Sequence, residues 1–309
     1  AYLVRRLLEN GANSSFVNQI VDEDVPPEVV AADPFDQLQD NAPTIPKGPE
    51  VFQPQRANAR GFDLAHTPTL AAIEEARAPF ADATWEAAPL LAGEAAPEAD
   101  ETVANPTGGA SPGTVRPASE ADVATALDNA APWDASLNTR RATLLRAADM
   151  FEDRYGEIFA ILAREAGKQL PDCVAELREA VDFLRYYAGQ ATNEPPADIF
   201  TCISPWNFPL AIFCGQVTAA LAAGNAVLAK PAEQTPLIAQ LAVKVLHEAG
   251  VPRAALQLLP GGGEVGAALT GDARVNGVAF TGSTATALRI RANMAEHCAP
   301  GTPLIAETG

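Results

Sequence analysis

Two side chains in the second half of the chain have a type and position suited to chemistry. Asn207 is the one uncharged amide in ISPWNFP (203–209), a turn with two prolines between an apolar run of strand length and a longer one of helical length. Its simplest role would be to cap the following helix. Glu307 follows the apolar residues LIA, so we expect burial to raise its pKa and suit it to act as a base on water. The alternative for Glu307 is an exposed strand-end residue that caps the next helix.

Three other segments could hold a ligand. KPAE offers Lys230 as a donor and Glu233 as an acceptor for ribose hydroxyls, although surface pairs of this kind are common. The glycines of PGGG (260–263) allow a ligand close to the backbone, or else form a flexible loop. FTGST opens a helix, where free N–H groups and the Ser283 hydroxyl favour a phosphate. Ala287 stands where a late glycine would be expected, so the standard dinucleotide fingerprint is absent.

These polar segments follow short apolar runs that alternate with helical stretches. The apolar runs are 199–203, 226–229, 256–259, 278–280 and 304–306, and the helical stretches are 210–223, 235–249, 263–270 and 284–297. The alternation predicts an α/β fold with a doubly wound parallel sheet. Right-handed crossovers would bring the strand ends to one edge, where open sheets bind ligands. Pro209 would lie in the first turn of the first of these helices.

The middle of the chain reads as scaffold. Residues 101–113 predict a strand and a hairpin turn, and Ser119 is expected to cap a helix. Apolar residues at helical spacing between Leu144 and Leu162 predict one helix that ends at Gly167, and a further helix follows from Val174. We assign these stripes to core packing rather than to chemistry.

Composition excludes several classes of protein. The 309 residues are 48% hydrophobic and 19% charged, which supplies a core, and the net charge of −18 argues against a nucleic-acid or anionic-lipid surface. No apolar run reaches the ~18 residues of a membrane span, and the first residues show no signal peptide. We expect a piece of a longer protein. The four cysteines and three histidines are scattered, so we expect no metal site, no disulfide framework, and a cytoplasmic location with reduced thiols.

The first twenty residues predict a helix with Arg5, Arg6 and Glu9 within about one turn. The arginines could form a solvated pair with Glu9 or converge on a carboxylate ligand. Prolines and acidic residues interrupt the pattern over 21–60, which we interpret as a linker.

The segment YLVRRLLENGANSSFVN (2–18) resembles the last barrel helix of the proline dehydrogenase family, in the form found in the bifunctional proline utilization A family. The resemblance implies that Arg5 and Arg6 hold the proline carboxylate, that Glu9 orients them, and that Tyr2 lines the pocket. It also implies FAD in the longer protein, although the flavin-binding barrel, apart from this helix, is not in this chain.

Five motifs together resemble the aldehyde dehydrogenase superfamily from about Asn105 to the last residue: SPWNFP, KPAEQTP, PGGG, FTGST and ETG. Residues 140–188 again resemble proline utilization A in particular. The resemblance implies that Asn207 donates its amide to an oxyanion and that Glu307 activates the water that hydrolyses a thioester. The NAD-binding residues that it implies are Ile203, Ser204, Trp206, Lys230, Glu233, Gly263, Gly266, Phe280, Thr281, Gly282 and Ser283. Among these, Lys230 and Glu233 would hold the adenosine ribose, and Gly282 and Ser283 would meet the pyrophosphate.

The reaction implied is the oxidation of glutamate γ-semialdehyde to glutamate, after flavin-dependent oxidation of proline. The family's nucleophilic cysteine lies beyond the E-x-G motif, and none of Cys173, Cys202, Cys214 and Cys298 matches it, so we expect this chain alone to be inactive. The expected domains are the proline dehydrogenase helix (1–20), the linker (21–60) and the truncated NAD-binding part (61–309). Glu233 should repel the 2′-phosphate of NADP.

Other interpretations stay open. The chain could instead be a non-catalytic NAD-binding or oligomerisation module, or, less in keeping with residues 2–18, a stand-alone aldehyde dehydrogenase. The resemblance also leaves room for a homo-oligomer and for quinone or membrane partners of the longer protein.

Overall fold

The computed structural model describes residues 22–33 and 46–309, which belong to two compact units divided after Pro46. The described part of the first unit contains the four-residue helix α3 (Pro27–Val30), with Pro27 at its first position, where proline's missing N–H leaves no bond unmade. The other elements of the described residues lie in the second unit, Lys47–Gly309, and the following paragraphs concern that unit.

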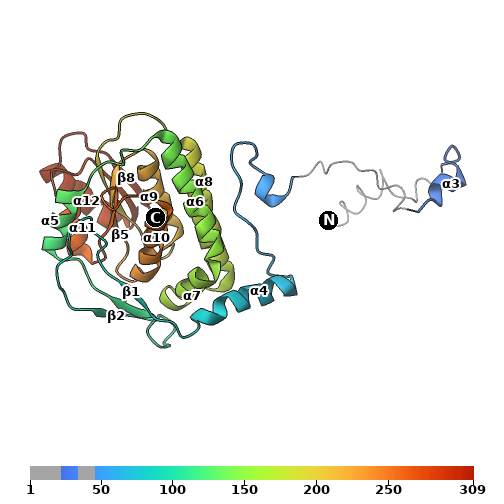
Figure 1. Ribbon diagram of the computed structural model, residues 1–309, viewed down its shortest axis with the longest axis horizontal. Coiled ribbons are helices and arrows are strands. Elements are labelled where there is room, and N and C mark those ends of the chain that lie inside the picture. The colour runs from blue at the N-terminus through green and yellow to red at the C-terminus, as the bar shows by residue number, and fades with distance from the viewer. Residues whose placement is uncertain (1–21, 34–45) are drawn as a thin grey trace. The chain divides into compact units, whose positions relative to one another are not determined.

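A five-stranded parallel sheet forms the centre of the second unit (Figure 1). Its strands, in spatial order, are β6 (Leu256–Leu258), β5 (Ala226–Lys230), β4 (Ile199–Ile203), β7 (Gly277–Gly282) and β8 (Leu304–Thr308). The chain runs outward from β4 to β5 and β6, and then returns to add β7 and β8 on the other side. The strand order therefore reverses between β4 and β7, and a crevice at such a point is the usual ligand site of open sheets. The predicted α/β fold with a doubly wound parallel sheet is confirmed.

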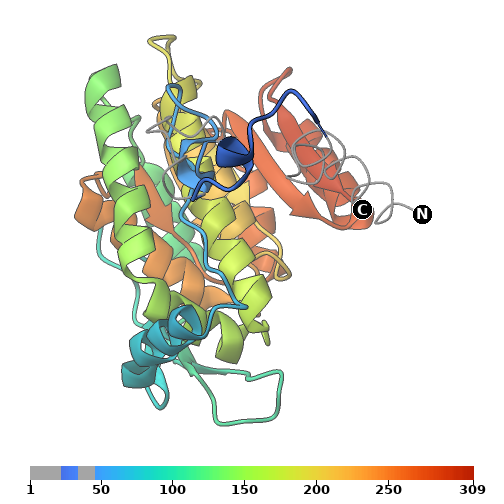
Figure 2. The same cartoon turned by 90° about the vertical axis from the view of Figure 1, so that its right-hand side faces the viewer.

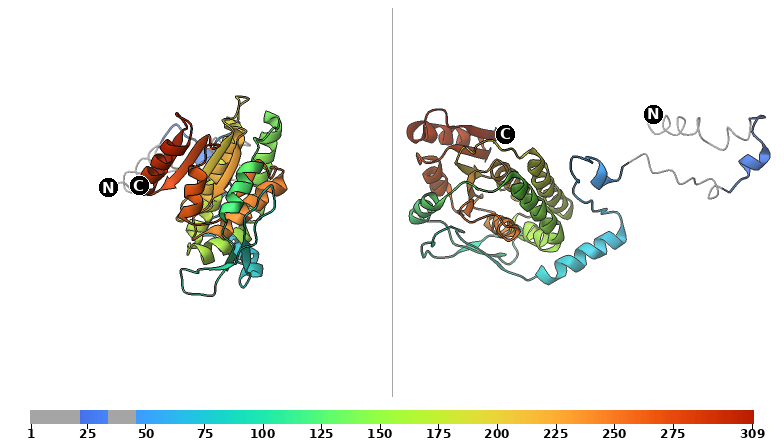
Figure 3. Two further views of the ribbon diagram at one scale, coloured as in Figure 1. Left: turned by 90° about the vertical axis from the view of Figure 1, so that its left-hand side faces the viewer. Right: turned by 45° about the horizontal axis from the view of Figure 1, so that its top comes forward.

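Helices cover both faces of this sheet (Figures 1 and 3). One layer contains α6 (Leu137–Asp153), α7 (Tyr155–Glu165), α8 (Leu170–Gln190), α9 (Ala211–Ala222) and α10 (Pro236–Ala249), and the other contains α5 (Glu120–Asn129), α11 (Gly263–Thr270) and α12 (Thr284–His297). Figure 2 shows α12 beside β8 at one end of the sheet. Among the described residues, no helix is both long and apolar enough to cross a membrane.

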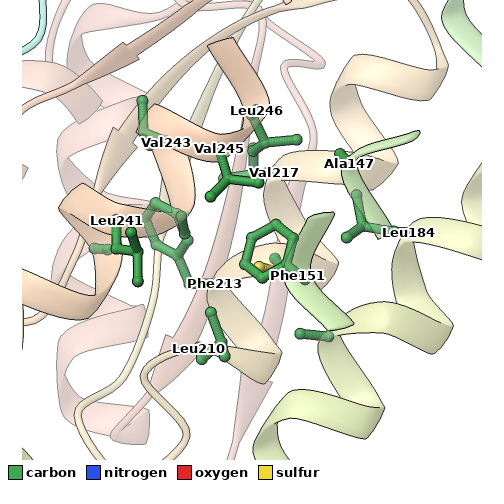
Figure 4. Packing of buried hydrophobic residues seen from close by; sticks show 14 of the residues in the cluster. Ala147, Phe151, Leu184, Leu210, Phe213, Val217, Leu241, Val243, Val245 and Leu246 are labelled. Carbon is green, nitrogen blue, oxygen red and sulfur yellow. The ribbon is translucent and has the colours of Figure 1, made fainter. Parts of the chain in front are cut away.

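The strands divide their side chains between the two layers because successive residues of a strand point to opposite faces. In β4, Cys202 packs with the α6–α10 layer, whereas Ile199 and Ile203 pack with the α11–α12 layer. Phe151 of α6 and Phe213 of α9 are fully buried between helices and strands (Figure 4). Burial of such side chains contributes about 1.5–3 kcal/mol each, so this layer holds the carboxyl edge of the sheet firmly.

The elements before the sheet agree with the sequence in most respects. β2 (Glu101–Val103) pairs antiparallel with β3 (Gly113–Val115), as the predicted hairpin requires, and β1 (Trp85–Ala87) adds a parallel third strand. Ser119 caps α5, because its hydroxyl accepts the N–H of Asp122 at 3.2 Å. The helix α4 (Thr67–Arg77) and the 3₁₀ turns η1 (Gly48–Glu50) and η2 (Ala78–Phe80) complete the unit.

One predicted helix is in fact two. The apolar stripe from Leu144 to Leu162 is interrupted at Arg154, whose φ of −94° and ψ of 18° end α6 and start α7. The break lets α7 press onto α4, since a Cβ at Gly156 would lie only 2.2 Å from the carbonyl oxygen of Ala76. Both helices bury the same kind of side chain in one core, so the spacing of apolar residues does not reveal the break.

Residues ahead of α4, from Lys47 onward, are also part of the second unit. The carboxylate of Asp182 in α8 accepts a hydrogen bond from the Arg56 guanidinium at 2.9 Å and another from the Ala59 N–H at 2.8 Å. The compact unit thus begins within the segment 21–60. The domain boundaries predicted from the sequence stay predictions.

Candidate functional site

A cleft of about 1000 Å³ lies at the carboxyl edge of the sheet, beside the ends of β4 and β7. It is lined by all thirteen residues that the sequence predicts as catalytic or NAD-binding: Ile203, Ser204, Trp206, Asn207, Lys230, Glu233, Gly263, Gly266, Phe280, Thr281, Gly282, Ser283 and Glu307. These residues come from the ends of all five strands and from the loops and helices that follow them, so the fold collects residues that lie about a hundred positions apart in the sequence.

The floor of the cleft is a row of side chains across three strands. Lys230, Ile203 and Phe280 are register partners in β5, β4 and β7, and they face the α11–α12 layer. Gly266 of α11 lies directly above them, since a Cβ built there would be in ordinary van der Waals contact with the Lys230 side chain at 3.5 Å. The close approach leaves the backbone of α11 as part of the cleft wall.

Lys230 is a buried cation in this floor. It is 4% exposed, and its Nζ donates to the carbonyl of Pro231 at 2.8 Å. Burial lowers the pKa of Lys230, while the carboxylates of Glu233 and Glu264 act in the opposite direction. An ammonium has three N–H donors, and the hydrogen bond to Pro231 uses one of them, so Lys230 can still donate to a ligand. Glu233 is exposed beside it, where its carboxylate accepts the Gln234 amide at 3.1 Å.

The helix α12 points its N-terminus into the cleft. Ser283 is the cap of this helix, since its hydroxyl accepts the N–H of Thr286 at 3.2 Å. Gly282 is required before it, because a Cβ would lie 2.6 Å from the Phe280 ring. The remaining free N–H groups of the first turn, with the positive end of the helix dipole, suit an anion such as a phosphate.

The turn that carries Asn207 projects into the cleft from the end of β4. Trp206, Asn207 and Phe208 are all exposed, and the Asn207 amide has no hydrogen-bond partner within residues 22–33 and 46–309. The alternative role for Asn207, as the cap of the next helix, is excluded because α9 has no local side-chain cap. The carboxylate of Glu176, from α8, instead accepts the N–H groups of Leu210 at 3.2 Å and Ala211 at 2.9 Å.

Helix α9 consequently starts at Ala211, and Pro209 precedes its first turn rather than lying within it. Lys168 completes the support of the Asn207 turn. Its Nζ lies 3.0 Å from Oε1 of Glu176 and 4.6 Å from the centre of the Phe208 ring. The amide of Asn207 is therefore held at the cleft by neighbours while its own hydrogen-bonding groups stay free.

Glu307 lies on the opposite face of the sheet edge from Lys230. It is the register partner of Thr281, and the two side chains point towards the layer that contains α9. Glu307 is exposed, so the burial on which the sequence-based expectation rested is wrong. The cause is the position of β8, which is the outermost strand of the sheet and has four exposed residues.

Two buried carboxylates of the site were not predicted from the sequence. One is Glu176, which is 1% exposed, and the other is Glu165, which is 3% exposed. Glu165 accepts the N–H groups of Leu237 at 2.6 Å and Ile238 at 3.0 Å, at the start of the helix that follows KPAEQT. Burial raises the pKa of Glu165 to about 8, although these two hydrogen bonds lower it. The available signal was a glutamate three residues after Leu162, on the apolar face of a helix.

The cysteines are free, and none is placed to act as a thiolate. Cys173, Cys202 and Cys214 are buried, and burial raises the pKa of all three thiols, to about 12 for Cys173 and Cys202. Burial also raises the pKa of the less buried Cys298. In the part of the chain that the structure describes, no three His, Cys, Asp or Glu side chains cluster in a way that could hold a metal ion. Tyr2, Arg5, Arg6 and Glu9 lie outside the described residues.

Known proteins share this fold and sequence. The aldehyde dehydrogenase family matches residues 94–309. The bifunctional protein PutA of Klebsiella aerogenes is 48% identical over 338 aligned residues, which cover all of this chain and 26% of that protein. The chain thus spans about a quarter of the length of this curated relative.

Two solved structures are also similar. A mutant of Bradyrhizobium japonicum proline utilization A (PutA) has a TM-score of 0.78 and 39% identity, over the whole of this chain and 31% of that one. The 1-pyrroline-5-carboxylate dehydrogenase from Thermus with bound NAD has a TM-score of 0.74 and 30% identity, over 82% of this chain and 55% of that one.

Proposed function

The chain belongs to the aldehyde dehydrogenase family, and from this premise we propose that it supplies the cofactor-binding part of an enzyme that oxidises glutamate γ-semialdehyde to glutamate with NAD. One observation carries the proposal: the residues of five separate motifs line a single cleft at the reversal point of a parallel sheet. The substrate is chosen because relatives of this chain are named PutA and 1-pyrroline-5-carboxylate dehydrogenase.

The residues of the cleft fit a dinucleotide. Lys230 and Glu233 would donate to and accept from the hydroxyls of the adenosine ribose, and the N-terminus of α12 at Gly282 and Ser283 would face the pyrophosphate. The buried Lys230 ammonium and the uncapped N–H groups of α12 support this fit because they are donors that a bound ligand could satisfy. NAD, when bound, supplies the acceptor for the hydride that leaves the aldehyde carbon.

Two residues of the chain would act on the substrate. The free amide of Asn207 would donate to the oxyanion that forms when a thiolate adds to the aldehyde. Glu307 would take a proton from the water that hydrolyses the resulting thioester. The cysteine that bears this thioester would lie outside these 309 residues, since none of the four cysteines lines the cleft and burial raises the pKa of the Cys173, Cys202 and Cys214 thiols.

The proposal extends to a longer, bifunctional and cytoplasmic protein. Its first activity would oxidise proline with FAD, with Arg5 and Arg6 holding the proline carboxylate, Glu9 orienting them and Tyr2 beside them. The alignment of the whole chain with 26% of a bifunctional protein supports this arrangement. A homo-oligomer and a quinone or membrane partner of the longer protein belong to the same proposal.

The test uses variants of the full-length protein. Asn207→Ala should lower kcat for semialdehyde oxidation by ~10²–10³ with little change in the Kd for NAD, because the amide acts only on the oxyanion. Glu307→Gln should still release one equivalent of NADH per active site, but it should slow later turnover. Asn193→Ala, in an exposed loop, is the matched control. Full activity of Asn207→Ala would refute the oxyanion role, and a non-catalytic module would show no turnover even in the wild type.

A further inference from the structure

A second cavity, of about 580 Å³, lies on the α8–α9 side of the sheet. Four residues line both this cavity and the cofactor cleft: Ile212, Phe280, Thr281 and Glu307. The wall between the two spaces is therefore one residue thick at Thr281 and Glu307. Solvent in the second cavity can reach these two side chains without passing through the space that the dinucleotide would occupy.

Gln216 of α9 fixes the hydrogen-bonding direction of Thr281. Its Nε2 donates to Oγ1 of Thr281 at 3.0 Å, while its Oε1 is buried and has no partner in the described part of the chain. An amide nitrogen only donates, so the Thr281 hydroxyl must direct its own proton elsewhere. The unpaired Oε1 faces the interior, where a water molecule would satisfy it.

Glu307 offers a candidate acceptor for the proton of Thr281. Thr281 and Glu307 are register partners on neighbouring strands, which lie about 4.8 Å apart, and their side chains share a face. The Thr281 hydroxyl and the Glu307 carboxylate make no direct hydrogen bond in the described structure, and this spacing suits one bridging water. Gln216 is therefore hydrogen-bonded to Thr281, and the exposed carboxylate of Glu307 lies one strand away on the same face of the sheet.

We infer that Gln216 is a positioning residue for hydrolysis: it turns the Thr281 hydroxyl towards Glu307, and the water that Glu307 deprotonates enters from the second cavity. The inference rests on the proposed function of Glu307. In the step, an O–H bond of water breaks and its proton moves to the Glu307 carboxylate. The water oxygen bonds to the thioester carbon, and the C–S bond breaks to release the thiolate. Thr281 and Gln216 orient the water and exchange no proton.

Rapid mixing of the full-length enzyme with NAD and semialdehyde separates the two half-reactions. Gln216→Met removes the donor and keeps the length of the side chain, so the first burst of NADH should persist while the steady-state rate falls roughly tenfold, less than the ~10²–10⁴ that loss of a general base costs. Gln216→Glu keeps the size but cannot donate, so Thr281 would donate to it instead, and the rate should fall at least as far. Gln190→Met, exposed at the end of α8, is the matched control.

A third variant tests the route of the water. Ala219→Phe fills the second cavity without altering the amide of Gln216, and it should slow the steady state while sparing the burst. A wild-type steady-state rate in Gln216→Met, or an equal loss of burst and steady state in Gln216→Met and Gln216→Glu, would overturn the positioning role. A wild-type rate in Ala219→Phe would overturn the route. If Glu307→Gln also hydrolyses the thioester at the wild-type rate, Glu307 is not the base. If hydrolysis is slow in Glu307→Gln but at the wild-type rate in Gln216→Met, only the inference about Gln216 is refuted.

Discussion

The side-chain amide of Asn207 is free because Glu176, rather than Asn207, caps the start of α9. The carboxylate of Glu176 takes the N–H groups at the start of α9, so nothing in the described structure competes for the Asn207 side chain. Lys230 and Glu307 show a second contrast between individual residues. Lys230 is buried, so little water competes with a ligand for its ammonium group. Glu307 is exposed to solvent.

We expect Glu233 to influence the choice between NAD and NADP. Its exposed carboxylate lies near the Lys230 ammonium, where the ribose of the adenosine would bind. A 2′-phosphate at that ribose would meet a like charge, which disfavours NADP. Glu233→Gln in the full-length enzyme should therefore raise kcat/KM for NADP relative to NAD by about tenfold, the equivalent of ~1.4 kcal/mol. An unchanged ratio would show that Glu233 does not set the preference.

Glu165 should make stability depend on pH. Burial raises its pKa in the folded chain from an ordinary 4.5 to about 8. Between these values the folded state holds a proton that the unfolded state releases, so the free energy of unfolding should fall as the pH rises from about 4.5 to about 8. Urea titrations at a series of pH values would measure this slope. Glu165→Gln should flatten it, and the exposed Glu75→Gln should not; equal slopes in all three proteins would contradict the assignment.

At the scale of elements, α9 and its turn depend on an ion pair. Lys168 lies 3.0 Å from the buried Glu176, and Lys168→Met would leave that carboxylate without its cation. Breaking a buried pair in this way costs about 3–5 kcal/mol, so the urea midpoint of the chain should fall clearly. Adding Glu176→Gln should recover part of the loss. Lys244→Met, on the exposed side of α10, should change the free energy of unfolding by less than about 0.5 kcal/mol; a similarly small effect of Lys168→Met would refute the role of the pair.

The strands of the five-stranded sheet were predictable from sequence because each coincides with a short, mainly apolar run between helical stretches. The run 199–203 coincides with β4, and the bounds of β5 and β6 differ by one residue. The caps of α9 and α10 were not predictable, since Glu176 and Glu165 lie 34 and 72 residues before the first N–H groups that they bind. The exposure of Glu307 was missed for a related reason: an apolar strand can occupy an edge, and the sequence does not say what covers that edge.

At the scale of the whole molecule, we expect the 309-residue chain to bind NAD without catalysing the oxidation of the semialdehyde. All the residues that the sequence predicts to bind NAD line one cleft, whereas none of the four cysteines lines it and burial raises the pKa of each thiol. The purified 309-residue chain should bind NAD in a calorimetric titration and form no NADH when semialdehyde is added. Lys230→Met should abolish much of the binding, and Lys244→Met should not. Measurable NADH formation by this chain would show that one of its own cysteines reacts.

The position of each strand in the sheet also indicates how readily that strand detaches from its neighbours. β4 is paired on both sides, whereas β8 has β7 as its one ladder partner among the described residues. Backbone amides of an edge strand exchange their hydrogens with solvent through local opening. Those of a central strand exchange only through global unfolding. The two proposed catalytic residues, Asn207 and Glu307, are therefore held by strands that differ in how readily they open. Within the described residues, transient detachment of β8 would displace Glu307 and leave Asn207 in place.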